Sequence, residues 1–483
     1  MGGRERDSAA WGPSPVSEKH SVIGAAIAPA TRLVAEPSDG LAASRRYAWY
    51  VVLLLTLTQV VSYIDRFLPS LLIGPIKEDL GLSDLQVGLL LGPAFGLFYV
   101  FVGIPIGWLA DRYSRRAILA CGISIWCAMT AAAGLARSFV PLFVARLGVG
   151  LGEATVAPCS VSIISDYFSR QRRARAISLF MAGTFLGAGS AFLFGGPIVH
   201  SIEHLPPIAV PGFGELRPWQ MAFVLVGMPG FVLAGLMFTI REPRRTDQAR
   251  HELQVGAGGH GSLRDAVGYV RTRWRGFGTL FVGSAAVVTM GSLTFWNVAL
   301  FDRTWGWNVR DVGIATGVLF FVGGPIGTLM GVRITYWFSE RGHRDATMRA
   351  LWFGLALAAF GFATYPVMPS AAAAIAALFV AFVGQAAAAA AGPASLTLIA
   401  PGQIKSQGVA LYYLFIGVFG QLLGPPPVGL MTDLFGDPAL LRYAMTIEAA
   451  VVGSIALLIV GRGLRHYRAA AEELERLVET GHD

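Results

Sequence analysis

Apolar residues recur along this chain in long runs, from Tyr47 almost to the C-terminus, with charged residues or Pro and Gly at the breaks. A helix needs about 20 mostly apolar residues to cross roughly 30 Å of hydrocarbon. About twelve runs reach that length, and we predict a membrane-spanning helix for each. They cover residues 46–73, 84–109, 116–136, 138–165, 174–199, 218–240, 277–302, 310–338, 346–366, 371–400, 406–432 and 439–462.

Positive charge is concentrated in alternate links between these runs, which predicts the orientation of the helices. Arginines cluster in the links around 112–116, 170–175, 241–275 and 341–349. Basic links face the cytosol, and an even number of spans then places both termini there. An Arg- and Ala-rich chain that is poor in Lys is typical of a GC-rich bacterial genome. We therefore expect a multi-pass protein of a bacterial inner (plasma) membrane with both termini cytoplasmic.

The longest link divides the predicted spans six and six. The sequence VGIPIG (Val102–Gly107) recurs as VGGPIG (Val322–Gly327), late in the second span of each half. This repeat predicts an all-α membrane protein with two pseudo-symmetric six-helix bundles, an architecture found in many secondary transporters. The predicted parts are a disordered cytosolic N-terminal tail (1–45), an N-terminal bundle (46–240), a cytosolic linker (241–275), a C-terminal bundle (276–462) and a cytosolic C-terminal tail (463–483). In the linker, SLRDAVGYVRTRW predicts a short amphipathic helix on the membrane surface.

The composition supports a membrane protein and argues against several other classes. Of the 483 residues 54% are hydrophobic and only 14% are charged, far from the usual balance of a soluble domain. The net charge of +8 lies in the short links and forms no basic stripe, so we expect no nucleic-acid partner. Neither a phosphate-cradling Gly-x-x-x-x-Gly-Lys loop nor a nucleophile with supporting acid–base groups is evident, which argues against an ATP-driven pump and an enzyme.

Cysteine and histidine positions predict neither a metal site nor a cofactor. The three cysteines fall inside apolar runs, where they are expected to be small core residues. The eight histidines lie in loops, tails or helix ends, and we interpret their spacing as unsuited to metal binding.

Four charged residues lie inside the first and fourth predicted spans. Asp65 and Arg66 are adjacent in YIDRF, and Arg146 and Glu153 are seven residues apart in RLGVGLGEA, hence on one helix face. A charge at that depth costs about 2.5–3.5 kcal/mol, so each needs a wet cavity or a partner. Neighbours on a helix point about 100° apart, so Asp65 and Arg66 do not simply neutralise each other. We predict that Asp65 carries a proton, with a fixed structural pair to an arginine such as Arg146 as the alternative. Arg146 and Glu153 either face the cavity or only pair with other helices.

The segment GWLADRYSRR, Gly107 to Arg116, resembles the signature of the major facilitator superfamily in the loop between the second and third spans. The resemblance implies a cytosolic gate, in which an ion network holds the inward side shut and breaks when that side opens. The alternative is a solvated turn with arginines. The candidate gate residues are Gly107, Asp111, Arg112, Arg115 and Arg116. Its counterpart at 327–344 lacks the Asp-Arg core, which predicts a weaker second latch.

Several segments together resemble the spinster-type branch of that superfamily: YIDRF, GLSDLQVGLL, GWLADRYSRR, RLGVGLGEA and the GGP that closes the fifth span. The likeness is dense from Tyr63 to Pro197 and thinner afterwards. Members of this branch move lysophospholipids and sphingoid-base phosphates coupled to protons. The resemblance implies proton coupling by Asp65 and Glu153 and head-group binding by Arg66 and Arg146. Further candidate lining residues in the C-terminal half are Trp296, Asn297, Arg303 and Tyr412.

Three functions remain open at this point. The first is proton-coupled secondary active transport of an amphiphilic lipid by alternating access, outward and by exchange, as an antiporter. The tenth span, Ala-rich and uncharged, would then form the apolar wall of the cavity, unless it is simply tightly packed. The second is a proton-driven carrier or exporter of a small organic anion or drug that Arg66 or Arg146 grips. The third is a non-transporting membrane sensor. We expect a monomer whose partners are its substrate, protons and membrane lipids.

Overall fold

The computed structural model describes residues 45–210, 214–243, 263–401 and 404–479. The described residues from Ala48 onward form one compact unit. The predicted disordered tail and most of the linker before residue 263 lie outside the described residues. Within the described residues, 12 helical segments are long and apolar enough to cross a membrane, which confirms the predicted number of spans.

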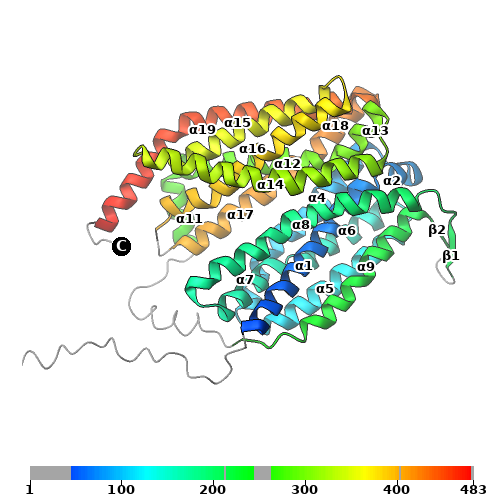
Figure 1. The fold of residues 1–483 in the computed structure, drawn as a ribbon, viewed down its shortest axis with the longest axis horizontal. Helices are drawn as coiled ribbons and strands as arrows, with labels where there is room; N and C mark the ends of the chain where they lie inside the picture. The colour runs from blue at the N-terminus through cyan, green and yellow to red at the C-terminus, as the bar shows by residue number, and fades with distance from the viewer. Residues whose placement is uncertain (1–44, 211–213, 244–262, 402–403, 480–483) are drawn as a thin grey trace, which may run out of the picture. The chain divides into compact units, whose positions relative to one another are not determined.

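The first six spans form the N-terminal bundle, blue to green in Figure 1. They are α1 (Arg45–Leu71), α3 with α4 (Asp84–Leu91, Pro93–Ala110), α5 (Arg115–Ala133), α6 with α7 (Phe139–Glu153, Val156–Tyr167), α8 (Arg170–Ile202) and α9 (Pro218–Met237). A short helix, α2 (Ile73–Leu80), and an antiparallel pair, β1 (Ile208–Val210) and β2 (Gly214–Leu216), lie between spans. We call the end of the helices that carries α2 and this pair the hairpin end. The opposite end, where α5 begins at Arg115, is called the basic end.

The last six spans form the C-terminal bundle, yellow-green to red in Figure 1. They are α12 with η2 and α13 (Trp274–Ser292, Leu293–Trp296, Asn297–Trp305), α14 (Val309–Glu340), α15 with η3 (Ala346–Thr364, Tyr365–Val367), α16 (Ala371–Ile399), α17 with α18 (Lys405–Leu422, Pro425–Phe435) and η5 with α19 (Pro438–Leu440, Leu441–Glu479). A separate helix, α11 (Leu263–Thr272), lies where the sequence predicts an amphipathic one. Because α19 runs on to Glu479, most of the predicted C-terminal tail is helical.

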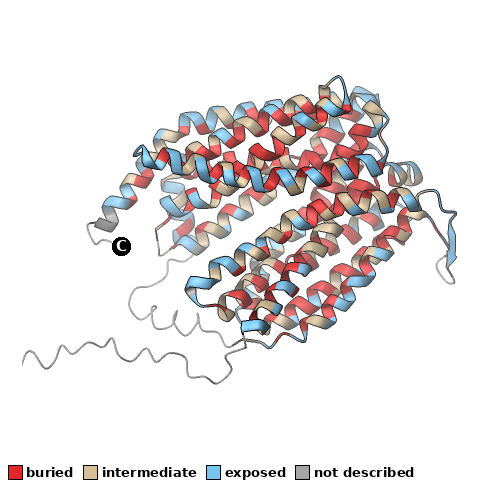
Figure 2. Ribbon diagram, in the orientation of Figure 1, coloured by how far each residue is buried: buried red, intermediate tan, exposed pale blue. Residues whose placement is uncertain are grey.

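Apolar side chains cover much of the outer surface of the helices. Figure 2 shows buried residues where helices face one another and exposed residues on the outer faces. Among the exposed side chains are Leu329 at 70%, Val232 at 65% and Phe360 at 64% exposure. Such an apolar exterior is unfavourable in water and favourable in lipid, as expected of a membrane-spanning protein.

Two spans are interrupted close to a proline. In the fourth span α6 ends at Glu153, and Pro158 near the start of α7 has no N–H to donate to the preceding turn. In the eleventh span α18 begins at Pro425, and the indole of Trp296 donates to the Pro425 carbonyl at 3.2 Å. Discontinuous helices of this kind often line the substrate sites of secondary transporters.

The Ala-rich tenth span, α16, is tightly packed between α14 and α15. A Cβ atom added at Gly361 of α15 would lie 2.5 Å from the backbone nitrogen of Ala381. One added at Gly331 of α14 would lie 2.6 Å from the carbonyl oxygen of Ala387. These close approaches need small residues on both sides, so the structure favours the packing explanation over the predicted apolar cavity wall.

Candidate functional site

Asp65 of α1 lies in a buried ion pair with Arg146 of α6. Arg146 Nη1 is 3.4 Å from Asp65 Oδ1, and the hydroxyl of Thr130 on α5 donates to Asp65 Oδ2 at 2.5 Å. The side chains of Asp65 and Arg146 are each only 2% exposed. In this conformation Asp65 and Arg146 therefore form the ion pair that was the alternative prediction for Asp65. The Thr130 hydroxyl can reorient when the Asp65 carboxylate gains or loses a proton.

Arg66, the next residue along α1, pairs with Glu153 instead. Arg66 Nη2 is 2.9 Å from Glu153 Oε2, and Ser62 donates to the same oxygen at 2.6 Å. Because neighbours on a helix point about 100° apart, Asp65 and Arg66 meet different partners on α6. We call Asp65, Arg66, Arg146 and Glu153 the charged quartet.

Three aromatic rings surround the guanidinium of Arg66. Its Cζ lies 4.5 Å from the ring centroid of Tyr63, 4.3 Å from that of Phe95 and 4.8 Å from that of Tyr99. Cation–π attraction holds the planar group in one orientation. The Arg66 side chain is 12% exposed, against 2% or less for the rest of the quartet, so it is the most accessible of the four.

The quartet also contains polar atoms that have no hydrogen-bond partner among the described residues. They are Arg66 Nε, Arg146 Nε and Glu153 Oε1. Buried polar atoms are usually satisfied, and exceptions often mark functional sites. The free donors suit an anionic ligand, and the free carboxylate oxygen is a place where a proton could be held.

The C-terminal candidates do not converge on the charged quartet. Trp296 is fully buried against α18, and the amide of Asn297 accepts a hydrogen bond from Tyr365 at 2.9 Å. Tyr412 is buried with its ring 5.8 Å from that of Phe281. All three stabilise the C-terminal bundle in this conformation, a role that their residue types did not reveal in the sequence.

Arg303 joins the two bundles at the hairpin end. Its guanidinium makes two hydrogen bonds, 2.9 and 2.8 Å long, to the carboxylate of Asp84 at the start of α3. Lys77 adds a third contact to Asp84 at 2.6 Å. Asp433 of α18 accepts from the backbone N–H groups of Asp84 and Leu85 at 2.9 and 2.8 Å, and so caps α3 from the other bundle. The sequence analysis missed Asp84, although a charged residue at the start of a span was a usable signal.

Close glycine contacts accompany this ion network. A Cβ atom at Gly88 would lie 2.6 Å from the carbonyl oxygen of Pro425, and one at Gly429 would lie 2.2 Å from that of Asp84. Between α8 and α14, a Cβ at Gly196 would lie 2.9 Å from the Cα of Gly313. The bundles therefore meet backbone to backbone along two lines at the hairpin end, which we call the hairpin seam.

Replacing Arg303 with alanine should loosen the hairpin seam. Removing one partner of a buried ion pair costs roughly 3 kcal/mol, here specifically in the closed arrangement. In protein whose native cysteines are replaced, a cysteine at Val312, which is buried beside Gly313, should react several-fold faster with a sulfonated maleimide. The exposed Arg310 serves as the matched control, and Arg310→Ala should leave the rate unchanged. Equal labelling of Arg303→Ala and the parent protein would contradict the assigned role.

At the basic end, Arg115 of the signature motif is the centre of an ion network. Arg115 contacts Asp166 at 2.5 Å and Glu242 at 2.8 Å, and the backbone N–H of Arg116 donates to Glu242 at 3.1 Å. Burial alone would raise the pKa of Glu242, but the hydrogen bonds from Arg115 and from the Arg116 and Ser114 groups outweigh it and lower the pKa. These contacts tie α5 to the ends of α7 and α9 within one bundle.

Three other residues of the predicted gate, Gly107, Asp111 and Arg112, are less buried than Arg115. Arg112 is exposed and stacks on the Trp108 ring with its Cζ 3.9 Å from the centroid. Asp111 is also exposed, and a Cβ atom at Gly107 would meet open space. The motif therefore combines a buried arginine, Arg115, with exposed residues.

The C-terminal bundle has a comparable network, although the sequence predicted a weaker latch there. Asp345, fully buried just before α15, accepts from Arg349 at 3.0 Å and from Arg468 of α19 at 2.9 Å. Burial would raise the pKa of Asp345, but the Arg468 and Arg349 hydrogen bonds lower it. In this network an aspartate is the central residue and its partners are arginines, whereas in the N-terminal bundle the central residue is Arg115 and its partners are acidic. A search for a second Asp-Arg motif therefore does not find this network.

The expectation about histidine spacing needs a correction. His200, Glu203 and His204 lie at the C-terminal end of α8, and their potential ligand atoms are all within 4.8 Å of one another. A helix brings residues three and four positions apart onto one face, so the sequence HSIEH carried this signal.

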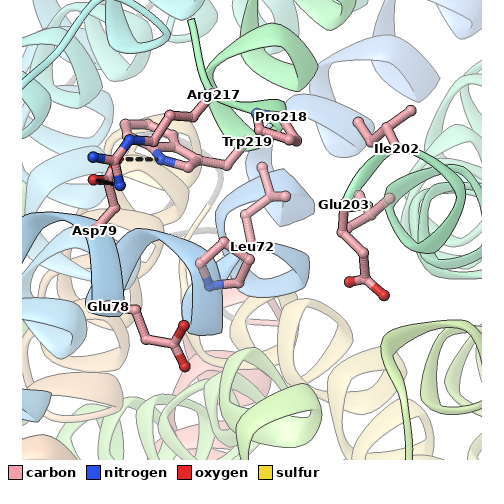
Figure 3. Close-up of a pocket in the computed structure, with 10 residues that line it drawn as sticks. Leu72, Glu78, Asp79, Ile202, Glu203, Arg217, Pro218 and Trp219 are labelled. Carbon is pink, nitrogen blue, oxygen red and sulfur yellow. Dashed lines mark hydrogen bonds and ion pairs between the residues drawn. The ribbon is translucent and has the colours of Figure 1, made fainter. Parts of the chain in front are cut away.

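Glu203 also borders a cavity of about 260 Å³ at the hairpin end. Figure 3 shows Glu203 and Ile202 on one side of it and Arg217, Trp219 and Asp79 on the other. Arg217 is ion-paired with Asp79, and the Trp219 indole donates to Asp79 at 2.8 Å. This cavity does not include the charged quartet.

A larger groove of about 580 Å³ is lined by apolar side chains of both bundles together with Arg271. Phe101 comes from α4 and Val270 from α11, while Phe281, Phe415 and Phe419 come from α12 and α17. Aromatic and aliphatic walls of this kind suit a hydrocarbon chain. The predicted amphipathic helix therefore contributes a wall of this groove.

Comparison with known proteins is consistent with this architecture. The family model described as Major Facilitator Superfamily matches residues 55–425. An MFS-type efflux pump of Mycolicibacterium smegmatis is 29% identical, in a match that covers 85% of this chain and 92% of the pump. A probable L-galactonate transporter of Escherichia coli is 27% identical, in a match that covers 63% of this chain and 66% of that transporter. A crystal structure of a bacterial homolog of the human lysosomal transporter Spinster, inward-facing and unoccupied, has a TM-score of 0.71 at 26% identity, covering 90% of this chain and 98% of that one.

Proposed function

Because the chain belongs to the major facilitator superfamily and resembles its spinster-type branch, we propose that it is a proton-coupled transporter of an amphiphilic lipid with an anionic head group. Lysophospholipids and sphingoid-base phosphates are the substrate classes that the resemblance suggests. The observation that carries the proposal is Arg66, held by three aromatic rings beside Glu153 and more exposed than the rest of the quartet.

The apolar lining of the groove supports an amphiphile. Phe95, which stacks on Arg66, and Phe101, which lines the groove, lie on the same helix α4. Six residues of helix correspond to about 9 Å along its axis. The same six residues turn through about 600°, so Phe95 and Phe101 point about 120° apart, and the chain of a ligand whose phosphate binds Arg66 would have to pass around α4 to enter the groove.

Substrate binding would promote proton uptake within the quartet. An anionic head group that binds Arg66 weakens the hold of that arginine on Glu153, and Asp65 depends in the same way on Arg146. A carboxylate that loses its cationic partner in a low-dielectric site gains a tendency to take up a proton. Binding of the anion and uptake of the proton are thereby linked, and we assign Asp65 and Glu153 as the proton carriers.

Alternating access would follow from motion of one bundle against the other. The hairpin seam is closed, with Arg303, Asp84 and Asp433 bridging the bundles. The Arg115 network stays within the N-terminal bundle. We propose that the basic end is cytoplasmic, as its arginines favour, and that outward opening breaks the seam while the motif at Asp111 and Arg112 closes the other side.

The second candidate is a carrier of a small organic anion. Arg66 is a planar donor suited to a carboxylate, and one relative is a probable L-galactonate transporter. On this alternative the groove would be incidental to transport.

Flux into proteoliposomes under an imposed pH gradient separates the two candidates. We expect a labelled lysophospholipid to move in response to the gradient and a short-chain organic anion such as a hexonate to remain at the level of protein-free liposomes. The uncoupler-treated sample is the control for proton coupling. Movement of the organic anion alone would overturn the lipid assignment, and movement of neither probe would overturn both.

A further inference from the structure

We propose that His200, Glu203 and His204 form a binding site for a divalent transition-metal ion, with Zn²⁺ as the probe. The site lies at the hairpin end of α8, apart from the charged quartet, and it goes beyond the proposed transport function. Its basis is the convergence of two imidazoles and one carboxylate on one face of a helix end.

The backbone brings the three side chains together. Helix α8 ends at Ile202, but the turn continues, since the Glu203 N–H donates to the Val199 carbonyl at 2.9 Å. Leu205 likewise donates to Ile202 at 2.9 Å. Residues 200, 203 and 204 therefore keep the i, i+3, i+4 relation of a helix, in which side chains are neighbours.

The potential ligand atoms are already close. His200 Nδ1 is 2.6 Å and His204 Nε2 is 3.5 Å from Glu203 Oε1, and the two imidazole rings are 5.6 Å apart. Metal–ligand bonds of about 2.0–2.2 Å place neighbouring ligands of one ion at separations of this order. Small rotations of the His204 side chain, which is 76% exposed, are enough to complete the set.

The donor types select the class of ion. Two imidazoles with one carboxylate suit Zn²⁺, Cu²⁺ and Ni²⁺, whereas Ca²⁺ and Mg²⁺ prefer an all-oxygen set. Three protein ligands leave a coordination position for water. The site is half open to solvent, since His200 and Glu203 are 32% and 28% exposed, so an ion has a path to it.

The surroundings are compatible with a bound cation. The cavity that Glu203 borders also contains the carboxylates of Glu78 and Asp79, and the one arginine in its lining, Arg217, is ion-paired with Asp79. His200 lies one helical turn beyond Gly196, whose backbone meets Gly313 in the hairpin seam. An ion here would fix the last turn of α8 next to the contact between the bundles.

Zinc titration of the full-length protein tests the site directly. The protein is purified in detergent through an affinity tag without histidine, and ZnCl₂ binding is measured by calorimetry. We expect one Zn²⁺ per chain in the micromolar range and a higher Tm with zinc present, because an ion that binds only the folded state stabilises it. Co²⁺ should give the visible absorption of a site with nitrogen ligands.

Variants distinguish this site from adventitious binding. His204→Ala and Glu203→Gln should each weaken zinc binding by at least about tenfold, and the double variant His200→Ala/His204→Ala should abolish the Tm shift. The matched control is His343→Ala at the basic end, where His343 contacts only the ring of Phe338 among the aromatic contacts that the structure describes; its binding should equal that of the wild type. Absence of zinc binding in the wild type, or equal binding in the double variant, would overturn the proposal.

Discussion

Asp65→Asn should abolish accumulation of substrate driven by a pH gradient. A difference of one pH unit supplies about 1.4 kcal/mol per proton, which supports a substrate concentration ratio of about tenfold for each proton coupled to transport. Asparagine keeps the shape of the carboxylate and can still accept from Thr130, but it cannot carry a proton. With Asp65→Asn, the ratio of substrate concentrations on the two sides of the proteoliposome membrane should therefore fall to about one.

Exchange of labelled for unlabelled substrate provides the control for folding and binding. Counterflow needs no net proton movement, so Asp65→Asn should retain it at least in part. The variant leaves Arg146 without its charged partner, and some loss of thermal stability is expected for that reason. A variant that still accumulates substrate in response to pH would rule out Asp65 as the proton carrier, and one that loses both activities would point to a structural pair.

Arg66→Lys should weaken substrate binding while preserving the charge. An ammonium group lacks the planar fork that stacks on Tyr63, Phe95 and Tyr99 and that binds a phosphate through two parallel hydrogen bonds. We expect a loss of about 2 kcal/mol, or roughly a 30-fold rise in the apparent KM, for the transported anion. The measurement is initial counterflow rate against substrate concentration.

The matched control is another arginine that stacks on an aromatic ring. Arg341 is exposed at the end of α14, with its Cζ 3.6 Å from the Trp337 ring. Arg341→Lys makes the same chemical change outside the quartet and should leave the apparent KM as it is. An unchanged KM in Arg66→Lys would mean that Arg66 pairs with Glu153 and stabilises the fold, and that it does not bind the head group of the substrate.

The sequence by itself determined the membrane character, the number of spans and the family. Each depends on local information: a run of about 20 apolar residues spans the bilayer whatever its neighbours do, and the signature Gly107 to Arg116 is contiguous in the chain. The sequence also singled out Asp65, Arg66, Arg146 and Glu153, because a charge inside an apolar run is costly wherever its partner lies.

Pairing within the quartet and the places of the C-terminal candidates were decided only by the tertiary structure. That Asp65 pairs with Arg146 and Arg66 with Glu153 depends on how α1 and α6 are rotated against each other. Arg303 was a reasonable head-group candidate by residue type, yet its partner Asp84 is 219 positions away in the chain. Side-chain chemistry fixes what a residue can bind, whereas the packing of helices distant in sequence fixes which partner it meets.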